Sequence, residues 1–273
     1  WSVYHRDDKA AKASYAGFVW DGDEFARRAK LSIAQADVLG RPQKTLAPGK
    51  YDVFLAPAAV SEILDLLGWG GFGLRAHQTK SSPFRQLREG TAALDARIGF
   101  AEDARGGGGP TFNAWGFTKP DCVDLVRGGR IVDTLCSPRS SAEFSVQTNG
   151  AGGAESPQSL VMYGGNLAME DAHATLDRGL YISNLWYLNY SDRNACRMTG
   201  MTRFATSWVE DGNAVAPVGV MRFDESLFEL FGPKVVDITR EQELILSGET
   251  YDERSVSSSR VPGLLARDFR LTL

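Results

Sequence analysis

The sequence is poor in cysteine, with only three such residues among 273. Cys122, Cys136 and Cys196 are odd in number, lie far apart and form no C-x-x-C pair. A disulfide framework or a zinc knuckle is therefore not expected, because both need cysteines in close, paired spacing. Reduced thiols in a cytoplasmic protein are the better interpretation.

Long apolar runs and concentrated positive charge are also missing. No run of about 18 apolar residues occurs, so the sequence predicts no membrane span. The net charge is −4 and the Lys and Arg residues are scattered. This argues against a nucleic-acid partner, because phosphate contacts need a concentrated basic surface. The first residues carry neither an initiator methionine nor the basic-then-apolar pattern of a signal peptide, which suggests a fragment of a longer protein.

Aromatic and β-favouring residues are plentiful in the stretch 181–223. Residues 181–190 are predicted to form a strand, and residues 202–209 and 214–223 are two further strand-like runs. The Asp-Gly pair between the last two runs favours a tight hairpin, because both residues accept positive φ angles. The stretch therefore predicts a β-meander with an aromatic core.

Helical spacing occurs in several other places. Residues 23–38 carry an apolar stripe, capped by the aspartate at position 21 or 23: Phe25, Ala29, Ile33 and Ala36. A buried strand at 51–56 runs into a helix that begins at Pro57. Residues 166–178 and 224–231 predict two more helices, the first closed by Gly179 and the second capped by Asp224. With a terminal strand at 261–273, these elements predict an α+β fold with a largely antiparallel, barrel-like sheet and a few peripheral helices.

Three motifs follow one another in the meander: Asn189-Tyr-Ser-Asp-Arg193, Thr199-Gly-Met-Thr-Arg-Phe204 and Val209-Glu-Asp-Gly212. In this order they resemble the C-terminal region of TldD/PmbA (TldE) proteins, the peptide-maturation proteins once called modulators of DNA gyrase. The resemblance extends to residues 51–67, 179–182, 217–223 and 262–265. It implies that residues 46–273 form the C-terminal-type domain of this family. Residues 1–45 would be a strand and helix leading in from an N-terminal domain that family members carry and that would be missing here.

The resemblance also makes a prediction about zinc. The catalytic TldD branch carries a His-Glu-x-x-x-His signature on the helix after the strand that corresponds to residues 51–56, and a Cys ligand near its C-terminus. Here the helix at 56–67 contains no histidine, and the region that matches the Cys ligand, residues 247–262, contains no cysteine. The chain therefore resembles the PmbA/TldE branch, which implies no catalytic residue and no metal in this chain and a zinc ion in a partner subunit.

Glu62 and His77 are weak candidates for a different metal or catalytic site. Glu62 lies on the helix that lacks the signature, but a lone carboxylate on a helix is usually a solvated surface group. His77 lies in a polar segment that could line a cleft, although a mobile surface loop is the simpler interpretation. The other histidines, His5 and His173, are more than one helical turn away in sequence. We expect His173 to be a hydrogen-bonded core residue.

The resemblance implies an extended peptide as the ligand, and an open strand edge can bind such a chain by adding it to the sheet. The candidate peptide-binding residues lie on or beside the meander: Trp186, Asn189, Tyr190, Arg203 and Arg222. The alternative is that Trp186 and Tyr187 are core residues, as aromatics often are. The arginines are favoured for surface contacts, because a guanidinium is rarely buried unpaired.

Three functions remain open. The preferred one is a non-catalytic, peptide-cleft-forming subunit of a TldD/TldE-like metallopeptidase complex, paired in a heterodimer with a zinc-bearing TldD-like homologue. The second is a self-sufficient peptide hydrolase that uses Glu62, His77 or a cysteine. The third is a homodimeric binding protein without a proteolytic role, since symmetric dimers are the commonest assemblies.

Overall fold

The computed structural model describes residues 1–6, 9–251 and 254–272. A thirteen-stranded sheet forms its centre. The strands of this sheet are β3 (Gly49–Leu55), β4 (Phe100–Glu102), β5 (Val123–Arg127), β6 (Arg130–Ile131), β7 (Ser159–Met162), β8 (Gly179–Ile182), β9 (Asn184–Asp192), β10 (Arg197–Arg203), β11 (Ser207–Glu210), β12 (Asn213–Pro217), β13 (Arg222–Ser226), β14 (Val235–Leu246) and β15 (Ser258–Leu271).

The sheet branches at β15, the predicted terminal strand. On one side β15 pairs with β14; elsewhere it pairs with β7, β3 and β13. One branch continues through β4, β5 and β6, a second through β8, β11 and β12, and a third through β10 to β9. Most pairs are antiparallel, with parallel pairing of β3 with β8 and of β7 with β15. The predicted α+β class is confirmed, and in the described residues the branches end in separate edge strands, so the sheet is open rather than a closed barrel.

The predicted meander is present, but each of its three strand-like runs is broken into two strands. The breaks fall at Ser183, between β10 and β11, and between β12 and β13. At the second break Phe204 has a φ of 55°. As a result β11 pairs with β8 and β12, whereas β10 pairs with β9 and β13. The Asp-Gly hairpin is confirmed, because Asp211 and Gly212 have φ angles of 50° and 70° and join β11 to β12.

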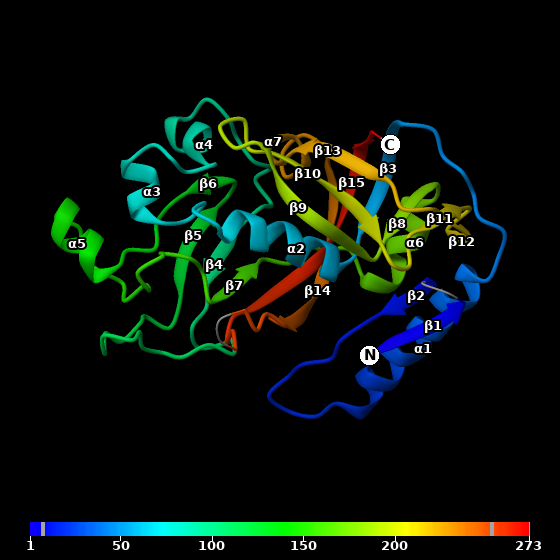
Figure 1. The fold of residues 1–273 in the computed structure, drawn as a ribbon, viewed down its shortest axis with the longest axis horizontal. Helices are drawn as coiled ribbons and strands as arrows, with labels where there is room; N and C mark the ends of the chain where they lie inside the picture. The colour runs from blue at the N-terminus through cyan, green and yellow to red at the C-terminus, as the bar shows by residue number, and fades with distance from the viewer. Residues whose placement is uncertain (7–8, 252–253, 273) are drawn as a thin grey trace.

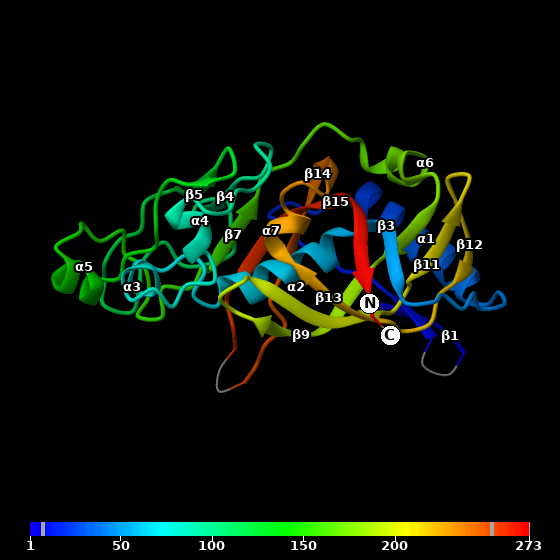
Figure 2. The ribbon, with the colours of Figure 1, turned by 90° about the horizontal axis from the view of Figure 1, so that it is seen from above.

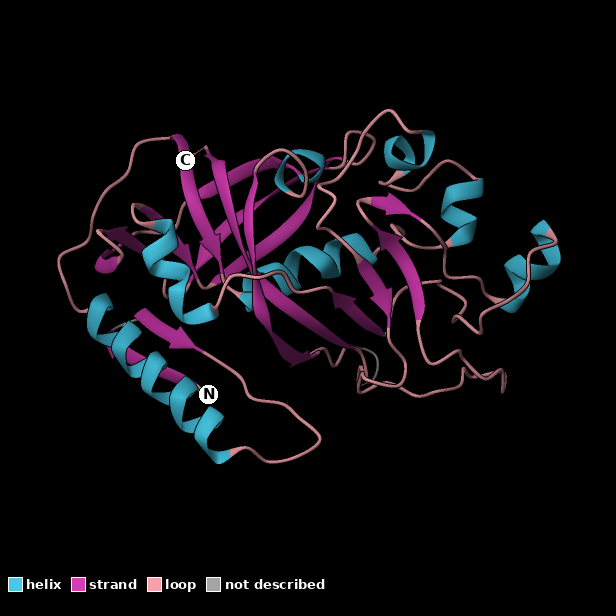
Figure 3. Cartoon of the chain, turned by 180° about the vertical axis from the view of Figure 1, so that it is seen from behind, coloured by secondary structure: helices cyan, strands magenta, loops and turns pink. Residues whose placement is uncertain are grey.

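Helix α2 (Pro57–Gly68) lies in the middle of the molecule, among the strands (Figures 1 and 3). The predicted apolar face at Val60, Ile63, Leu64 and Leu67 is fully buried. Ala59, Ser61 and Leu66 are buried too, since α2 packs against both β15 and β9, and Asp65 is its one exposed residue. A helix enclosed in this way needs apolar residues around most of its circumference.

Shorter helices lie around the sheet. They are α3 (Leu74–Gln78), α4 (Arg85–Glu89), α5 (Pro138–Phe144), the 3₁₀ turn η1 (Met169–Asp171), α6 (Ala172–Leu176) and α7 (Leu227–Leu230). The predicted helix at 166–178 is therefore much shorter than expected. Asp177, with a φ of 53°, takes the left-handed position after α6, and Gly179 begins β8 instead. The predicted helix at 224–231 is also shorter, because Asp224 lies in β13 and pairs with Arg197.

The N-terminal segment forms a small unit at one end of the molecule (Figures 1 and 2). It consists of the hairpin β1 (Ser2–Arg6) and β2 (Lys9–Lys12) and the helix α1 (Gly22–Leu39). The predicted cap is confirmed, since the Asp21 side chain accepts hydrogen bonds from the backbone of Asp23 and Glu24. The predicted apolar stripe is wrong at Ile33, which is 55% exposed. The buried face instead contains Arg28, whose charge is paired with Glu24 and Glu243. Among the described residues, no helix is long and apolar enough to cross a membrane.

Candidate functional site

A cleft of about 800 Å³ separates the N-terminal unit from the sheet. One wall is the segment Tyr15–Phe18 with the first turns of α1, and the opposite wall is β14 from Arg240 to Leu244. Arg260 of β15 and the start of η1 complete it. The described residues that line the cleft include carboxylates and arginines but no histidine, cysteine or serine. Such a lining can bind polar groups, but it offers no serine or cysteine nucleophile and no metal-binding imidazole.

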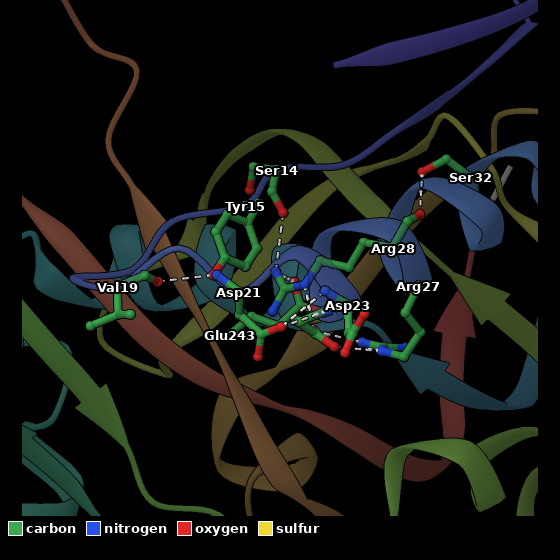
Figure 4. A network of polar contacts seen from close by, with 10 residues as sticks. Ser14, Tyr15, Val19, Asp21, Asp23, Arg27, Arg28, Ser32 and Glu243 are labelled. Carbon is green, nitrogen blue, oxygen red and sulfur yellow. Dashed lines mark hydrogen bonds and ion pairs between the residues drawn. The ribbon is translucent and has the colours of Figure 1, made fainter.

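Arg28 holds the two walls together (Figure 4). Its side chain is only 10% exposed and lies between Glu24 of α1 and Glu243 of β14, with N–O distances of 2.7 and 3.0 Å. The same guanidinium donates to the Ser14 carbonyl at 3.0 Å and lies against the ring of Tyr15. Because four groups from three segments meet on one side chain, Arg28 fixes the width of the cleft at this point.

The carboxylates in this network have opposite pKa shifts. The hydrogen bond from Arg27 is the largest cause that lowers the pKa of Glu24, to about 2, with Arg28 adding to it. Burial raises the pKa of Glu243, while Arg28 and Arg27 act against that rise. Glu24 is therefore charged at any ordinary pH, and Glu243 depends on Arg28 for its charge.

The second half of β14 has an open edge toward this cleft. Ser247 N–H donates to Ser257 O, whereas Ser258, which faces Leu246, donates its N–H away from β14 to Gln158 O. Pairing alternates along an antiparallel ladder, so Gln242, Leu244 and Leu246 direct their backbone groups away from β15. Pro262, which has no N–H, faces Gln242 as this alternation requires. No described residue forms a hydrogen bond with these outward groups.

The first half of the same edge is already covered by the chain itself. Gly165 N–H donates to Thr239 O at 2.9 Å, and Arg240 N–H donates to Leu167 O at 2.7 Å. The segment from Gly165 to Leu167 thus lies on β14 as an added strand would. This segment shows that the edge of β14 can accept an extended chain. It ends where the cleft begins, and no described segment pairs with the outward side of β14 beyond that point.

The predicted peptide-binding residues lie elsewhere, on the outer face of β9, β10 and β13. Trp186 and Tyr187 are 49% and 79% exposed, so their interpretation as core residues is wrong. The Arg203 guanidinium lies 4.4 Å from the Trp186 ring centroid, which brings these two predicted residues together. Arg222 is exposed on β13, opposite Met201.

Asn189 and Tyr190 are held in contacts within the protein. The Asn189 side chain accepts the N–H of Tyr190 at 2.8 Å, and the Tyr190 hydroxyl donates to Leu66 O at 3.0 Å. Burial raises the pKa of Tyr190 well above its usual range. The hydroxyl therefore stays protonated and ties β9 to the end of α2.

Glu62 is not the solvated surface group that its position on a helix suggested. Its carboxylate accepts the N–H of Leu185 at the start of β9, and burial raises its pKa to about 7. On the same helix the hydroxyl of Ser61 lies 2.7 Å from that of Ser259 in a buried contact. These polar groups of α2 are used in joining the helix to the strands.

His77 also differs from the expectation of a mobile surface loop. It lies in α3, its Nε2 is 2.9 Å from Gly71 O, and burial lowers its pKa to about 4. The other histidines lie on separate elements, His5 in β1 and His173 in α6. The His173 imidazole packs edge-on against Tyr181 instead of making the expected hydrogen bond.

In the part of the chain that the structure describes, no three His, Cys, Asp or Glu side chains gather closely enough to hold a metal ion. The residues present therefore do not fit the zinc site of the catalytic branch.

Sequence reasoning missed β14 and its cleft. The run from Val235 to Leu246 lacks a clean alternation of apolar and polar residues, because Arg240, Glu241 and Glu243 face the cleft or its rim. The signal that could have revealed it is the charged run from Arg240 to Glu243, followed later in the chain by a strand that contains Pro262. Proline in a strand marks a ladder position without a donated hydrogen bond.

Comparisons with known proteins found one family model and several similar solved structures. The family model for the PmbA/TldA metallopeptidase C-terminal domain matches residues 48–273. TldE from Thermococcus kodakarensis has a similar structure, with a TM-score of 0.74 at 12% identity over 92% of this chain and 56% of that one. A proposed modulator of a DNA gyrase from Thermotoga maritima gives 0.71 at 16% identity over 92% and 55%. A further proposed modulator of DNA gyrase, from Bacteroides thetaiotaomicron, gives 0.68 at 17% identity over 89% and 51%.

The chain thus spans about half the length of these solved structures. At such identities the structural likeness shows the fold alone. No curated protein matches the chain significantly. The family model, in contrast, covers most of the chain from β3 to its end. The chain therefore belongs to the TldD/PmbA family.

Proposed function

We propose that this chain is a non-catalytic subunit of a TldD/TldE-like metallopeptidase complex and forms part of its peptide cleft. The observation that carries the proposal is the open edge of β14, which lies inside a cleft with no histidine, cysteine or serine among its described lining residues. A site of this kind binds an extended chain through its backbone and leaves the chemistry to another group.

The peptide would be bound as a strand beside β14. The outward N–H and C=O groups of Gln242, Leu244 and Leu246 match the alternating groups of an extended peptide. The segment at Tyr15–Phe18 would cover the peptide from the opposite side. This placement does not use the predicted peptide-binding residues Asn189 and Tyr190, since both are hydrogen-bonded within the protein. Trp186, Arg203 and Arg222 would contact a longer substrate or the partner outside the cleft.

Zinc and the general base would come from a homologous partner with the His-Glu-x-x-x-His signature, in a cytoplasmic heterodimer that acts in peptide maturation. Family membership supports this partner. The helix α2, on which the catalytic branch carries its signature, has its polar side chains Ser61 and Glu62 engaged with β15 and β9. A zinc-activated water would therefore have to be supplied from across the subunit interface.

The test is to purify the full-length protein from its own host without chelator and to measure zinc content and intact mass. Zinc that appears only when a second chain with the signature co-purifies is the expected result. Stoichiometric zinc in this chain alone would overturn the proposal and would favour a self-sufficient hydrolase. A zinc-free homodimer without the second chain would favour the plain binding protein.

A further inference from the structure

A second hollow, of about 230 Å³, lies between α1 and the edge of the sheet formed by β8, β11 and β12. It uses the later turns of α1, whereas the charged cleft uses the first turns. In Figures 1 and 2 this end of the molecule holds α1, α6 and β12 together. The hollow belongs to neither the cleft nor the proposed peptide edge.

The hollow exists because its walls carry small side chains. Four of its lining residues are small: Ala34 of α1, Ala214 of β12, Ala205 and Ser207. The hollow opens to the surface, since Ala34 is exposed and Leu31 is 43% exposed. Four small residues at one contact between a helix and a sheet therefore leave room for a ring or a short aliphatic chain.

Hydrogen-bonding groups meet at one wall of this apolar space. The Tyr181 hydroxyl accepts a hydrogen bond from Gln35 Nε2 at 3.0 Å, and its own proton has no acceptor among the described residues. The His173 ring packs edge-on against Tyr181, with 5.0 Å between ring centroids, and makes no hydrogen bond to a described residue. Ser207 pairs with Tyr181 in the ladder between β11 and β8, and its hydroxyl is likewise without a described partner.

We propose that this hollow binds a small uncharged amphipathic molecule, with an apolar body of one ring and a hydroxyl or amide head. The head would accept the Tyr181 proton and reach Ser207 or His173, while the body would lie against Ala34, Ala214 and the apolar residues of α1. No Lys, Arg, Asp or Glu is among the described residues that line the hollow. A charged head would therefore lose its hydration without gaining an opposite charge.

Benzyl alcohol is a suitable probe, and benzoate is its charged counterpart with the same ring. Titration of the isotope-labelled chain, followed by backbone amide NMR shifts, is expected to give a dissociation constant of about 1 mM for a ligand of this size. The shifts should concentrate at Tyr181, Ser207 and Ala214. Benzoate should bind at least about tenfold more weakly.

Ala214→Leu should fill the hollow and abolish the shifts, whereas Ala142→Leu, an equal change on the exposed helix α5 at the other end of the molecule, should leave them unchanged. Tyr181→Phe should weaken binding about fivefold by removing one hydrogen bond. Ala34→Leu fills the same space from α1 and replaces Ala214→Leu if that variant does not fold.

Absence of saturable shifts, shifts elsewhere, or binding that survives the filling variants would overturn the proposal. Equal affinities for benzoate and benzyl alcohol, or unchanged binding in Tyr181→Phe, would overturn the assignment of an uncharged hydroxyl or amide head group to the ligand.

Discussion

The edge strands β9 and β14 differ in what their outward backbone groups contact. On β9 the N–H of Leu185 is taken by the Glu62 carboxylate, and the N–H of Tyr190 by the Asn189 side chain. Tyr187, with a φ of 57°, lies in a bulge where β9 has one residue more than β10. Capped donors and a bulge are the ways in which proteins stop an edge strand from pairing with another chain.

On β14 the outward groups of Gln242, Leu244 and Leu246 have no such contact with the described residues, and Gln242 and Leu244 line the cleft. An exposed aromatic strand that carries a sequence motif is therefore not by itself the place where a peptide adds to the sheet. Backbone groups that the fold leaves unpaired are a better guide, because an unpaired donor or acceptor gains most from a new partner.

The largest effect is expected at the closed edge, from Glu62→Gln. Burial raises the Glu62 pKa from 4.5 to about 7 in the folded protein. The stability that goes with the protonated carboxyl is therefore complete below pH 4.5 and is lost as the pH rises through 7. At pH 8 the variant, whose amide oxygen can still accept the Leu185 N–H, should be more stable than the parent by up to about 3 kcal/mol. Urea unfolding at pH 5 and pH 8 measures this difference.

The same experiment can contradict the assignment. If the parent and Glu62→Gln lose stability equally between pH 5 and pH 8, another group controls the pH dependence. Glu62→Ala should be less stable than Glu62→Gln at both pH values, because it leaves the N–H of Leu185 without an acceptor.

The wall of the open edge should depend on Arg28. Arg28→Ala leaves Glu243 half-buried without its partner, so we expect the free energy of unfolding to fall by about 2 kcal/mol. This is less than for a fully buried pair, because the Glu243 side chain is 24% exposed. Arg27→Ala is the matched control, since Arg27 also pairs with Glu24 but its side chain is 52% exposed. This variant should lower the free energy of unfolding by at most about 1 kcal/mol. Chemical unfolding gives both values, and limited proteolysis within residues 14–20 should accelerate only in Arg28→Ala. Equal losses in the two variants would rule out a special role for Arg28.

Much of the fold was predictable, and the reasons show why the site was not. Local signals identified α2 and the Asp-Gly hairpin, since periodicity, proline placement and turn chemistry act over a few residues. The breaks at Ser183 and Phe204 arise from pairing with strands far away in sequence, so no local pattern reveals them. The contacts of Glu62 with Leu185 and of Arg28 with Glu243 join positions more than a hundred residues apart. The open edge of β14 is a property of the whole sheet.

Leu244→Pro tests the open edge directly. Proline removes the outward N–H of Leu244 but no hydrogen bond to β15, so the fold should persist while an added strand loses a contact and meets the proline ring. Binding of a fluorescein-labelled hexapeptide of alternating serine and valine should weaken at least about tenfold, as measured by fluorescence anisotropy. Leu244→Ala keeps the N–H and should change binding by less than about threefold, within one lost apolar contact. Equal weakening by both substitutions would mean that the side chain, and not the backbone edge, holds the peptide.

The smallest effect is expected on the outer face of β9, where Trp186 and Arg203 are in contact. Their stacking at 4.4 Å is exposed, so a double-mutant cycle with Trp186→Ala and Arg203→Ala should give a coupling energy of about 0.5–1 kcal/mol in urea unfolding. Neither substitution should change binding of the hexapeptide by more than about twofold, since a short peptide on β14 does not reach this face. A tenfold loss in Trp186→Ala, with Leu244→Pro unaffected, would reverse the comparison and place the peptide on β9. The two edges are thus distinguished by the same binding assay.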